Sequence, residues 1–169
     1  MSHEEYDRFI DAHNDVRALP VHIYDASGMT IQEIRAQASA YHRRSPVGVV
    51  LIDYVQLIRN ERKDLNKVDR IGEASKGTKA MAKDLDVPCI LLAQINREGG
   101  KKNKLSIEDL KGSGEIEEDA DEIVMLSRPG IRDEDVDAGR TIVEVVKNRH
   151  GPTGGCALHF DLQYSRFVD

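Results

Sequence analysis

The sequence predicts one α/β domain with a mostly parallel sheet flanked by helices and an antiparallel hairpin near its carboxyl end. Two short apolar runs rich in β-forming residues, 49–52 and 88–93, are separated by a stretch with helical periodicity. Each run ends in a polar residue, Asp53 or Gln94. Such runs are typical of buried parallel strands, whose carboxyl ends form the ligand-binding edge of open α/β sheets. The glycine-rich segment 150–155 predicts a turn between two later strands.

Length and composition indicate one intracellular domain, residues 1–169. A chain of 169 residues buries roughly two thirds of the surface that its unfolded form exposes, so it needs no metal or disulfide to fold. The two cysteines, Cys89 in an apolar run and Cys156 in the glycine-rich turn, fit a reducing cytosol better than a disulfide framework. No signal peptide or membrane-spanning run is visible. We therefore expect a soluble, cytoplasmic protein.

The net charge of −6 disfavours a surface coated with basic residues for nonspecific nucleic-acid binding. Two local basic segments, 97–104 and 147–150, confine any such role to loops. No Cys or His cluster predicts a zinc site, and no nucleophile motif predicts a hydrolase of the Ser/His/Asp type.

Two helices are predicted in the first quarter of the chain, each beginning with a capping box. The first box is Ser-x-x-Glu at residues 2–5, and its helix ends before Pro20. The second is Thr-x-x-Glu at residues 30–33. Residues 21–25 are predicted as a short strand and residues 27–28 as a turn.

The rest of the chain alternates helix and strand and then becomes β-rich, which favours the α/β class. The predicted elements are a strand over 48–54, a charged loop over 59–67, a helix over 68–85, a strand over 88–94, a basic loop over 96–104, a polar, partly helical stretch over 106–119 interrupted at 112–114, a buried strand over 122–127, an acidic loop over 129–139, a strand over 141–147 and a strand over 156–161 that pairs with it.

Asp53 has the Walker B arrangement, in which a carboxylate at a strand end orients a water on Mg²⁺ bound to nucleotide phosphates. The alternative is a carboxylate that caps a loop. Gln94 is placed to orient an attacking water or to contact a γ-phosphate, and its alternative is a hydrogen bond to a neighbouring loop. The 169 residues contain no Walker A loop, so the predicted ATP site is only half present.

Two further groups are candidates for phosphate contacts. Lys147 and Arg149 alternate on a predicted strand, so their side chains point the same way and suit a phosphate or an arginine finger acting on a neighbouring subunit. A solvated basic hairpin is the alternative. Lys111, Gly112 and Gly114 form a segment whose open backbone amides suit a phosphate of nucleic acid or nucleotide, and a flexible turn is the alternative.

Four blocks, 50–57, 87–97, 109–121 and 147–154, occur in a specific order and spacing. Together they resemble the carboxyl-terminal motor domain of the DnaB-type replicative DNA helicases, and the resemblance covers almost the whole chain. It implies a RecA-like fold and a ring, usually hexameric, that moves on single-stranded DNA by using ATP and Mg²⁺ between neighbouring subunits. It also implies primase and helicase-loader partners and a bacterial or phage origin.

The resemblance assigns roles to single residues. Asp53 is similar to the Walker B Asp that reaches Mg²⁺ through water, and Gln94 to the residue that couples nucleotide state to the DNA loop. Lys147 and Arg149 are similar to the pair inserted into the adjacent subunit's nucleotide site. The residues that it implies in DNA binding are Arg97, Lys111, Gly112 and Gly114. The family often has Arg-Glu where this chain has Lys111 and Gly112, so a weaker grip on DNA is expected there.

The chain departs from the family by absence, since neither the Walker A loop nor the catalytic Glu occurs in the 169 residues. We expect the chain alone not to hydrolyse ATP, and we expect truncation before the P-loop strand to leave a hydrophobic edge at the strand ending in Gln94 that favours self-association. An ATPase-incompetent module that regulates a helicase ring or binds DNA is the alternative function. A KaiC-like or other RecA-type relative is a third, which the block at 109–121 disfavours.

Overall fold

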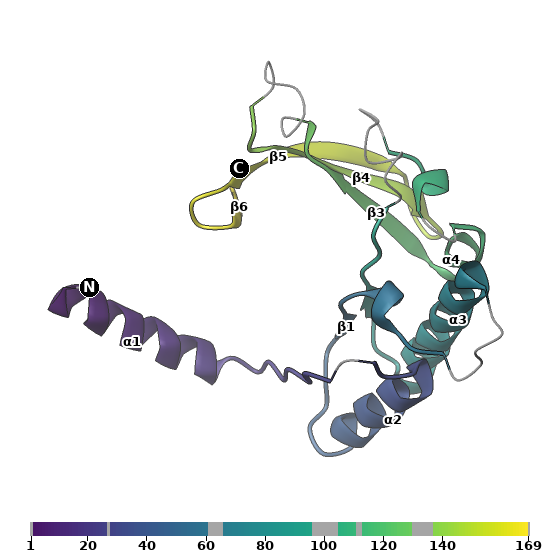
Figure 1. The fold of residues 1–169 in the computed structure, drawn as a ribbon, viewed down its shortest axis with the longest axis horizontal. Helices are drawn as coiled ribbons and strands as arrows, with labels where there is room; N and C mark the ends of the chain where they lie inside the picture. The colour runs from purple at the N-terminus through teal and green to yellow at the C-terminus, as the bar shows by residue number, and fades with distance from the viewer. Residues whose placement is uncertain are drawn as a thin grey trace.

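Two β-sheets form the framework of the part of the chain that the computed structural model describes, residues 2–26, 28–60, 66–95, 105–110, 113–129 and 137–168. The first is a parallel pair and the second is antiparallel, with its four strands in chain order (Figure 1). The parallel pair is β1 (Val50–Ile52) and β2 (Cys89–Leu91), and the antiparallel sheet is β3 (Glu122–Ser127), β4 (Arg140–Asn148), β5 (Gly154–Asp161) and β6 (Arg166–Val168). The predicted α/β class is confirmed.

The helices begin and end where local sequence chemistry predicts. Both predicted capping boxes are present, at the start of α1 (His3–Ala18) and of α2 (Ile31–His42). The long helix α3 (Lys67–Leu85) begins at Asn66, whose side chain accepts from two first-turn amides. It ends at Asp86, which adopts the left-handed conformation with φ of 53°.

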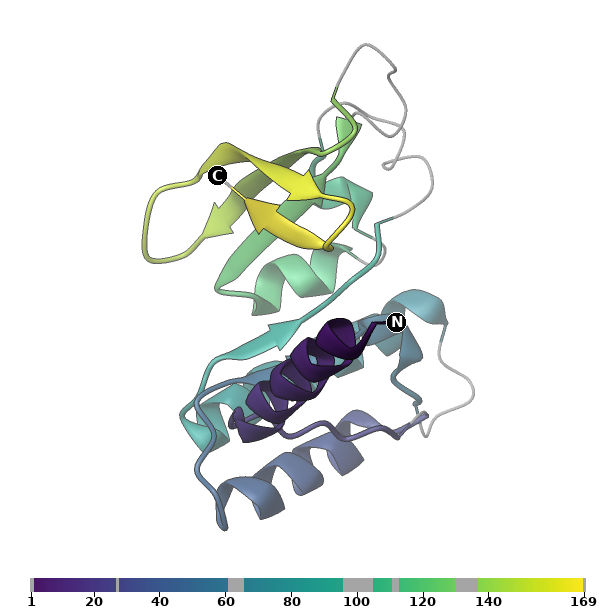
Figure 2. The same ribbon diagram turned by 90° about the vertical axis from the view of Figure 1, so that its left-hand side faces the viewer.

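Helix α3 joins two apolar cores. Towards its end, Met81 and Leu85 pack with Ile31 of α2 and Ile52 of β1. Met81 is fully buried, which stabilises the fold by about 1.5–3 kcal/mol relative to exposure. Towards its start, α3 packs against the second core, whose buried members are Val55, Ile71, Ala74, Leu105, Leu110, Ile116, Ile123 and Met125. Leu91 of β2 packs against both cores, so α3 and the parallel pair together connect the two. The antiparallel sheet lies above this part of the molecule in Figure 2.

Strand β3 is buried on one face only, which corrects the prediction of a buried strand. Ile123 and Met125 lie in the core, whereas Val124 and Leu126 are about half exposed. The strand alternates as an antiparallel edge strand does, since β4 is its sole described neighbour.

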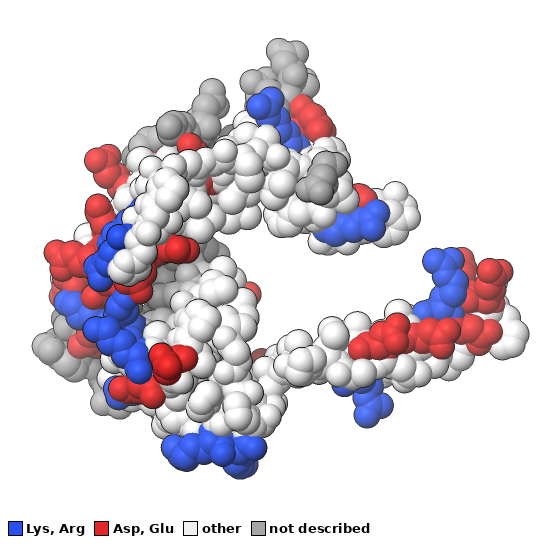
Figure 3. All heavy atoms as spheres, turned by 180° about the vertical axis from the view of Figure 1, so that it is seen from behind, with Lys and Arg blue, Asp and Glu red and all other residues white. Residues whose placement is uncertain are grey.

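Helix α1 extends away from the rest of the molecule (Figures 1 and 3), and none of its residues is buried. The predicted strand at 21–25 is wrong, because these residues have no regular structure and no described strand lies beside them to share hydrogen bonds. Ile23, for example, is 82% exposed.

Several predicted boundaries are corrected as well. The strands predicted over 48–54 and 88–94 contain only three paired residues each. The break predicted at 112–114 is wrong in part, because Ser113 begins α4 (Ser113–Asp119). Short 3-10 turns, η1 (Val55–Leu57) and η3 (Ile107–Asp109), and strand β6 were not predicted. Within the described ranges, no helix has the length and apolar character required to cross a bilayer.

Candidate nucleotide and DNA site

The parallel pair brings Asp53 and Gln94 to the same edge of the sheet. Ile52 pairs with Leu91, so the residues that follow β1 and β2 leave the sheet side by side. Both Asp53 and Gln94 are exposed. The prediction that two polar strand ends lie together therefore agrees with the backbone geometry.

A residue that was not predicted, Gln56, holds the end of β2. Its side-chain Nε2 donates to the carbonyl of Gln94 at 3.2 Å, and its Oε1 accepts from the Gln94 amide at 3.3 Å. The amide of Val55 donates to the carbonyl of Leu92 at 2.8 Å. Hydrogen bonds thus join the turn after Asp53 to the segment that leads to Gln94. No sequence pattern around Gln56 predicts this contact.

The Asp53 carboxylate is chemically suited to a water-bridged magnesium ion. It is exposed and makes neither a hydrogen bond nor an ion pair with any residue that the structure describes. Mg²⁺ keeps several waters and often takes only one or two carboxylates beside nucleotide phosphates. No group of three or more potential ligands occurs within the described ranges, so the remaining coordination would come from water and phosphate. The residues present fit Mg²⁺ bound in this way.

A β-bridge links the end of β2 to the segment predicted to contact DNA. Ile95, next to Gln94, pairs antiparallel with Leu110. Leu110 is buried in the second core and directly precedes Lys111 in the sequence. One bridge therefore joins the residue that follows Gln94 to the residue that precedes Lys111 in the sequence. Arg97, Lys111 and Gly112 lie outside the described residues, and Gly114 is exposed in the first turn of α4.

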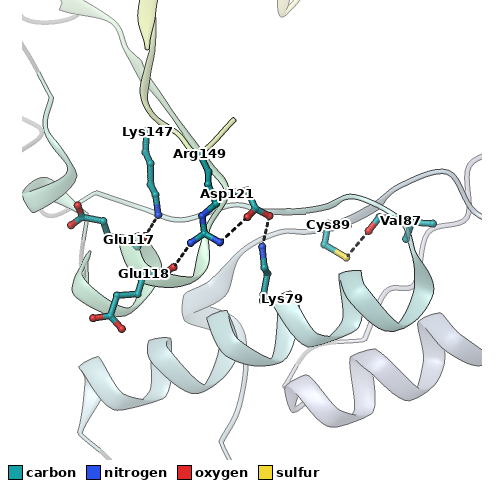
Figure 4. A network of polar contacts seen from close by, with 8 residues as sticks. All are labelled: Lys79, Val87, Cys89, Glu117, Glu118, Asp121, Lys147 and Arg149. Atoms are coloured by element: carbon teal, nitrogen blue, oxygen red, sulfur yellow. Dashed lines mark hydrogen bonds and ion pairs between the residues drawn. The ribbon is translucent and has the colours of Figure 1, made fainter. Parts of the chain in front are cut away.

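Lys147 and Arg149 lie beside the carboxyl end of α4 (Figure 4). Lys147 Nζ donates to the carbonyl of Glu117, and Arg149 Nη2 donates to the carbonyl of Glu118 at 3.1 Å. Arg149 Nη1 also lies 3.4 Å from Asp121 Oδ1. Across the described part of the chain, no hydrogen bond or ion pair joins Lys147 or Arg149 to Asp53 or Gln94.

Asp121 is the second residue that was not predicted. Its carboxylate contacts Arg149 and also Lys79 of α3. The hydrogen bond from Lys79, followed by the charges of Lys79, Arg149 and His150, holds the pKa of Asp121 below its ordinary value despite some desolvation. The carboxylate is therefore ionised at neutral pH. In sequence it resembles any acidic residue of an acidic segment, which is why composition alone did not single it out.

On the side of the molecule drawn in Figure 3, the described charged side chains do not form one basic patch. On the side of the molecule formed by α3 and α4, Lys and Arg alternate with Asp and Glu (Figure 3). Lys76, for example, pairs with Glu115, which raises the pKa of Lys76. This mixture of charges agrees with the net charge of −6, which disfavours a surface coated with basic residues.

The model of the DnaB-like helicase C terminal domain matches residues 1–169. The chain belongs to this family. The predicted resemblance is thereby confirmed.

Relatives within the DnaB-like family agree with the assignment. The replicative DNA helicase DnaB of Rickettsia typhi is 33% identical over 187 aligned residues, which cover 99% of this chain and 38% of that protein. The replicative DNA helicase DnaC of Bacillus subtilis is 32% identical and covers 100% of this chain, again with 38% of its own length. The DnaB-like chain thus spans less than half of these relatives.

Solved structures place this member of the DnaB-like family in the same fold as helicase ATPase domains. One of them, described as an ATPase domain, has a TM-score of 0.92 at 28% identity and covers 100% of this chain and 61% of its own. A DnaB-like replicative helicase studied with its primase interactions gives a TM-score of 0.91 at 28% identity, covering 99% of this chain and 41% of its own. The RecA-like fold expected from the resemblance is confirmed.

Proposed function

We propose that this chain is the carboxyl-terminal portion of a replicative, ATP-dependent DNA helicase motor that acts as a ring on single-stranded DNA. The observation that supports this most directly is the pairing of β1 with β2, which puts Asp53 and Gln94 on one edge within a chain matched over 1–169 by one helicase family. Asp53 binds Mg²⁺ through water, and Gln94 senses the γ-phosphate.

The nucleotide bound at this edge is contacted by residues of two neighbouring subunits. Lys147 and Arg149 make no described contact with Asp53 or Gln94 of their own chain, which supports a role in the site of a neighbouring subunit. Asp53 would hold Mg²⁺ through water, and the ion would supply positive charge at the nucleotide phosphates. Gln94 orients the water, and the guanidinium of Arg149 stabilises the transferred phosphoryl group from across the interface.

DNA contacts the segment Lys111–Gly114 and Arg97, and the Ile95–Leu110 bridge relates that segment to Gln94. Primase is a candidate partner because the DnaB-like neighbour of known structure was studied with its primase interactions, and a helicase loader is a second candidate. The relatives are bacterial proteins, so the cytoplasm is the proposed place of action.

The 169 residues contain no Walker A loop, so the chain alone is proposed not to turn over ATP. This is tested by measuring phosphate release from the purified chain with Mg²⁺-ATP, with and without single-stranded DNA. Appreciable turnover, lost in Asp53→Asn, would overturn the half-site assignment. The regulatory module would be favoured by a different result. In that case the chain shows no turnover, binds DNA or a helicase in the presence of Mg²⁺, and contributes nothing to hydrolysis in a complete motor.

The motor role is tested in a chimera in which this chain replaces the matched region of the Bacillus subtilis relative. Arg149→Ala is expected to lower DNA-stimulated hydrolysis by roughly 10³-fold or more and to leave nucleotide binding intact. Arg140→Ala, at the exposed far end of β4, is the matched control and should retain turnover. Equal turnover in wild type and Arg149→Ala would refute the role of Arg149 as an arginine finger.

A further inference from the structure

Arg149 is held by its own chain through three contacts that use both ends of the residue. Its backbone amide donates to the carbonyl of Asp121 at 2.8 Å. Its Nη2 donates to the carbonyl of Glu118 at 3.1 Å, and its Nη1 lies 3.4 Å from the Asp121 carboxylate. Each terminal nitrogen therefore has one partner in its own chain, although each keeps a second N–H. These contacts fix the direction of the guanidinium, so movement of Arg149 toward a phosphate elsewhere would break them.

The carbonyls of Glu117 and Glu118 belong to the last turn of α4. The carbonyl of Ile116 is satisfied within the chain by the amide of Ala120 at 3.0 Å. Those of residues 117 and 118 are among the carbonyls that a helix end leaves without an internal partner, and Lys147 and Arg149 donate to them. Two cations at the negative end of the helix dipole therefore cap α4.

Asp121 links this cap to α3. Its carboxylate pairs with Lys79 on one side and Arg149 on the other (Figure 4). The Asp121 and Arg149 side chains are each 46% exposed, so their ion pair is weak enough to exchange for a phosphate. Glu117 and Glu118 point their carboxylates away from Arg149 in Figure 4, which leaves Asp121 as the described carboxylate in contact with it.

We propose that Asp121 is a positioning residue that keeps Arg149 in a resting position at the end of α4, so that release of Arg149 to a neighbouring phosphate is tied to movement of α4. This inference rests on the proposed function. Helix α4 begins at Ser113, directly after Lys111 and Gly112. DNA that displaces that segment moves α4, breaks the carbonyl contacts and frees the finger. The resting position is thus what makes hydrolysis depend on DNA.

The first test uses the 169-residue chain itself and needs no nucleotide. Side-chain NMR of Arg149 is expected to show slow guanidinium rotation in the wild type and fast rotation in Asp121→Asn. The control Glu122→Gln removes the same charge one residue away, at an exposed site, and should match the wild type. Asp121→Glu, which keeps the charge, should restore slow rotation. Unchanged rotation in Asp121→Asn would overturn the proposal.

The second test measures hydrolysis in the chimera described above. Asp121→Asn is expected to raise DNA-independent turnover several-fold and to reduce the stimulation by DNA, whereas a merely structural defect would lower both rates. If Arg149→Ala abolishes turnover but Asp121→Asn leaves both rates equal to or below those of the wild type, this inference fails and the motor assignment stands. If Arg149→Ala changes nothing, the finger assignment fails, and the NMR result alone decides whether Asp121 positions Arg149.

Discussion

The carboxamide of Gln56 makes a reciprocal pair of hydrogen bonds with the backbone of Gln94, at 3.2 and 3.3 Å. A side chain that follows β1 thereby fixes the backbone of the residue that follows β2. The contact explains how a three-residue strand such as β2 can present a side chain in a defined place, because the strand alone ends before Gln94.

Gln56→Leu should therefore loosen the end of β2. Each lost hydrogen bond is worth about 0.5–1.5 kcal/mol, so the amide of Gln94 is expected to exchange with solvent roughly tenfold faster. Hydrogen exchange followed by NMR measures this. Gln37→Leu, at an exposed position of α2, is the control and should leave exchange at Gln94 unchanged. Equal protection in the two variants would contradict the role of Gln56.

Gly77 of α3 packs closely against Ile31 of α2. A Cβ added there would overlap Ile31, with Cγ2 only 2.9 Å away. Helix propensity alone favours Ala over Gly by about 1 kcal/mol, but overpacking costs about 1–3 kcal/mol. Gly77→Ala is therefore expected to lower the free energy of unfolding in urea titrations.

The sign of that effect should depend on Ile31. In an Ile31→Ala background the overlapping atoms are gone, so Gly77→Ala should be neutral or stabilising. A double-mutant cycle measures the coupling directly. A stabilising Gly77→Ala with Ile31 in place would show that the two helices do not approach as closely as described.

The two cysteines should react at different rates. Cys89 is half-buried, and desolvation raises the pKa of its thiol, whereas Cys156 is exposed. Since the thiolate is the nucleophile, Ellman's reagent at pH 7–8 should label Cys156 first, and labelling of Cys89 should rise as the pH approaches its raised pKa. Cys156→Ser and Cys89→Ser assign the two phases. Faster labelling of Cys89 would mean that β2 is open to solvent.

The exposed face of the parallel pair should promote self-association. Leu51 and Ile90 are neighbours in the β1–β2 register and are 62% and 48% exposed, and both outer edges of this sheet lack a described partner strand. Sedimentation velocity should reveal oligomers of the isolated chain that Leu51→Lys reduces. Leu162→Lys, at a comparably exposed turn position, is the control. A monodisperse monomer at high concentration would contradict the prediction.

Prediction from sequence succeeded where structure is local. Capping boxes and a left-handed cap depend on residues a few positions apart, so α1, α2 and α3 have nearly the predicted bounds. The strand predicted at 21–25 was wrong because strand propensity cannot supply a neighbouring strand. The prediction that β3 is buried on both faces was wrong because an apolar run does not reveal how many layers cover the strand.

The site was predictable only in part, for a similar reason. The order of Asp53 and Gln94 along two strands implies their adjacency, which the register agrees with. The contacts of Gln56 and Asp121 join residues 38 and 42 positions away, and nothing in either local sequence specifies the partner. Roles for Lys111, Gly112 and Arg97 remain predictions, because these residues lie outside the described ranges.

The capping of α4 by Lys147 and Arg149 uses main-chain oxygens, and this has an evolutionary consequence. Substitutions at positions 117 and 118 can accumulate without removing the acceptors, so these positions are under no pressure to change together with the two cations. Methods that infer contacts from correlated substitutions are blind to such a link. Related chains can therefore share this connection between the β4–β5 hairpin and α4 while their sequences at the end of α4 diverge.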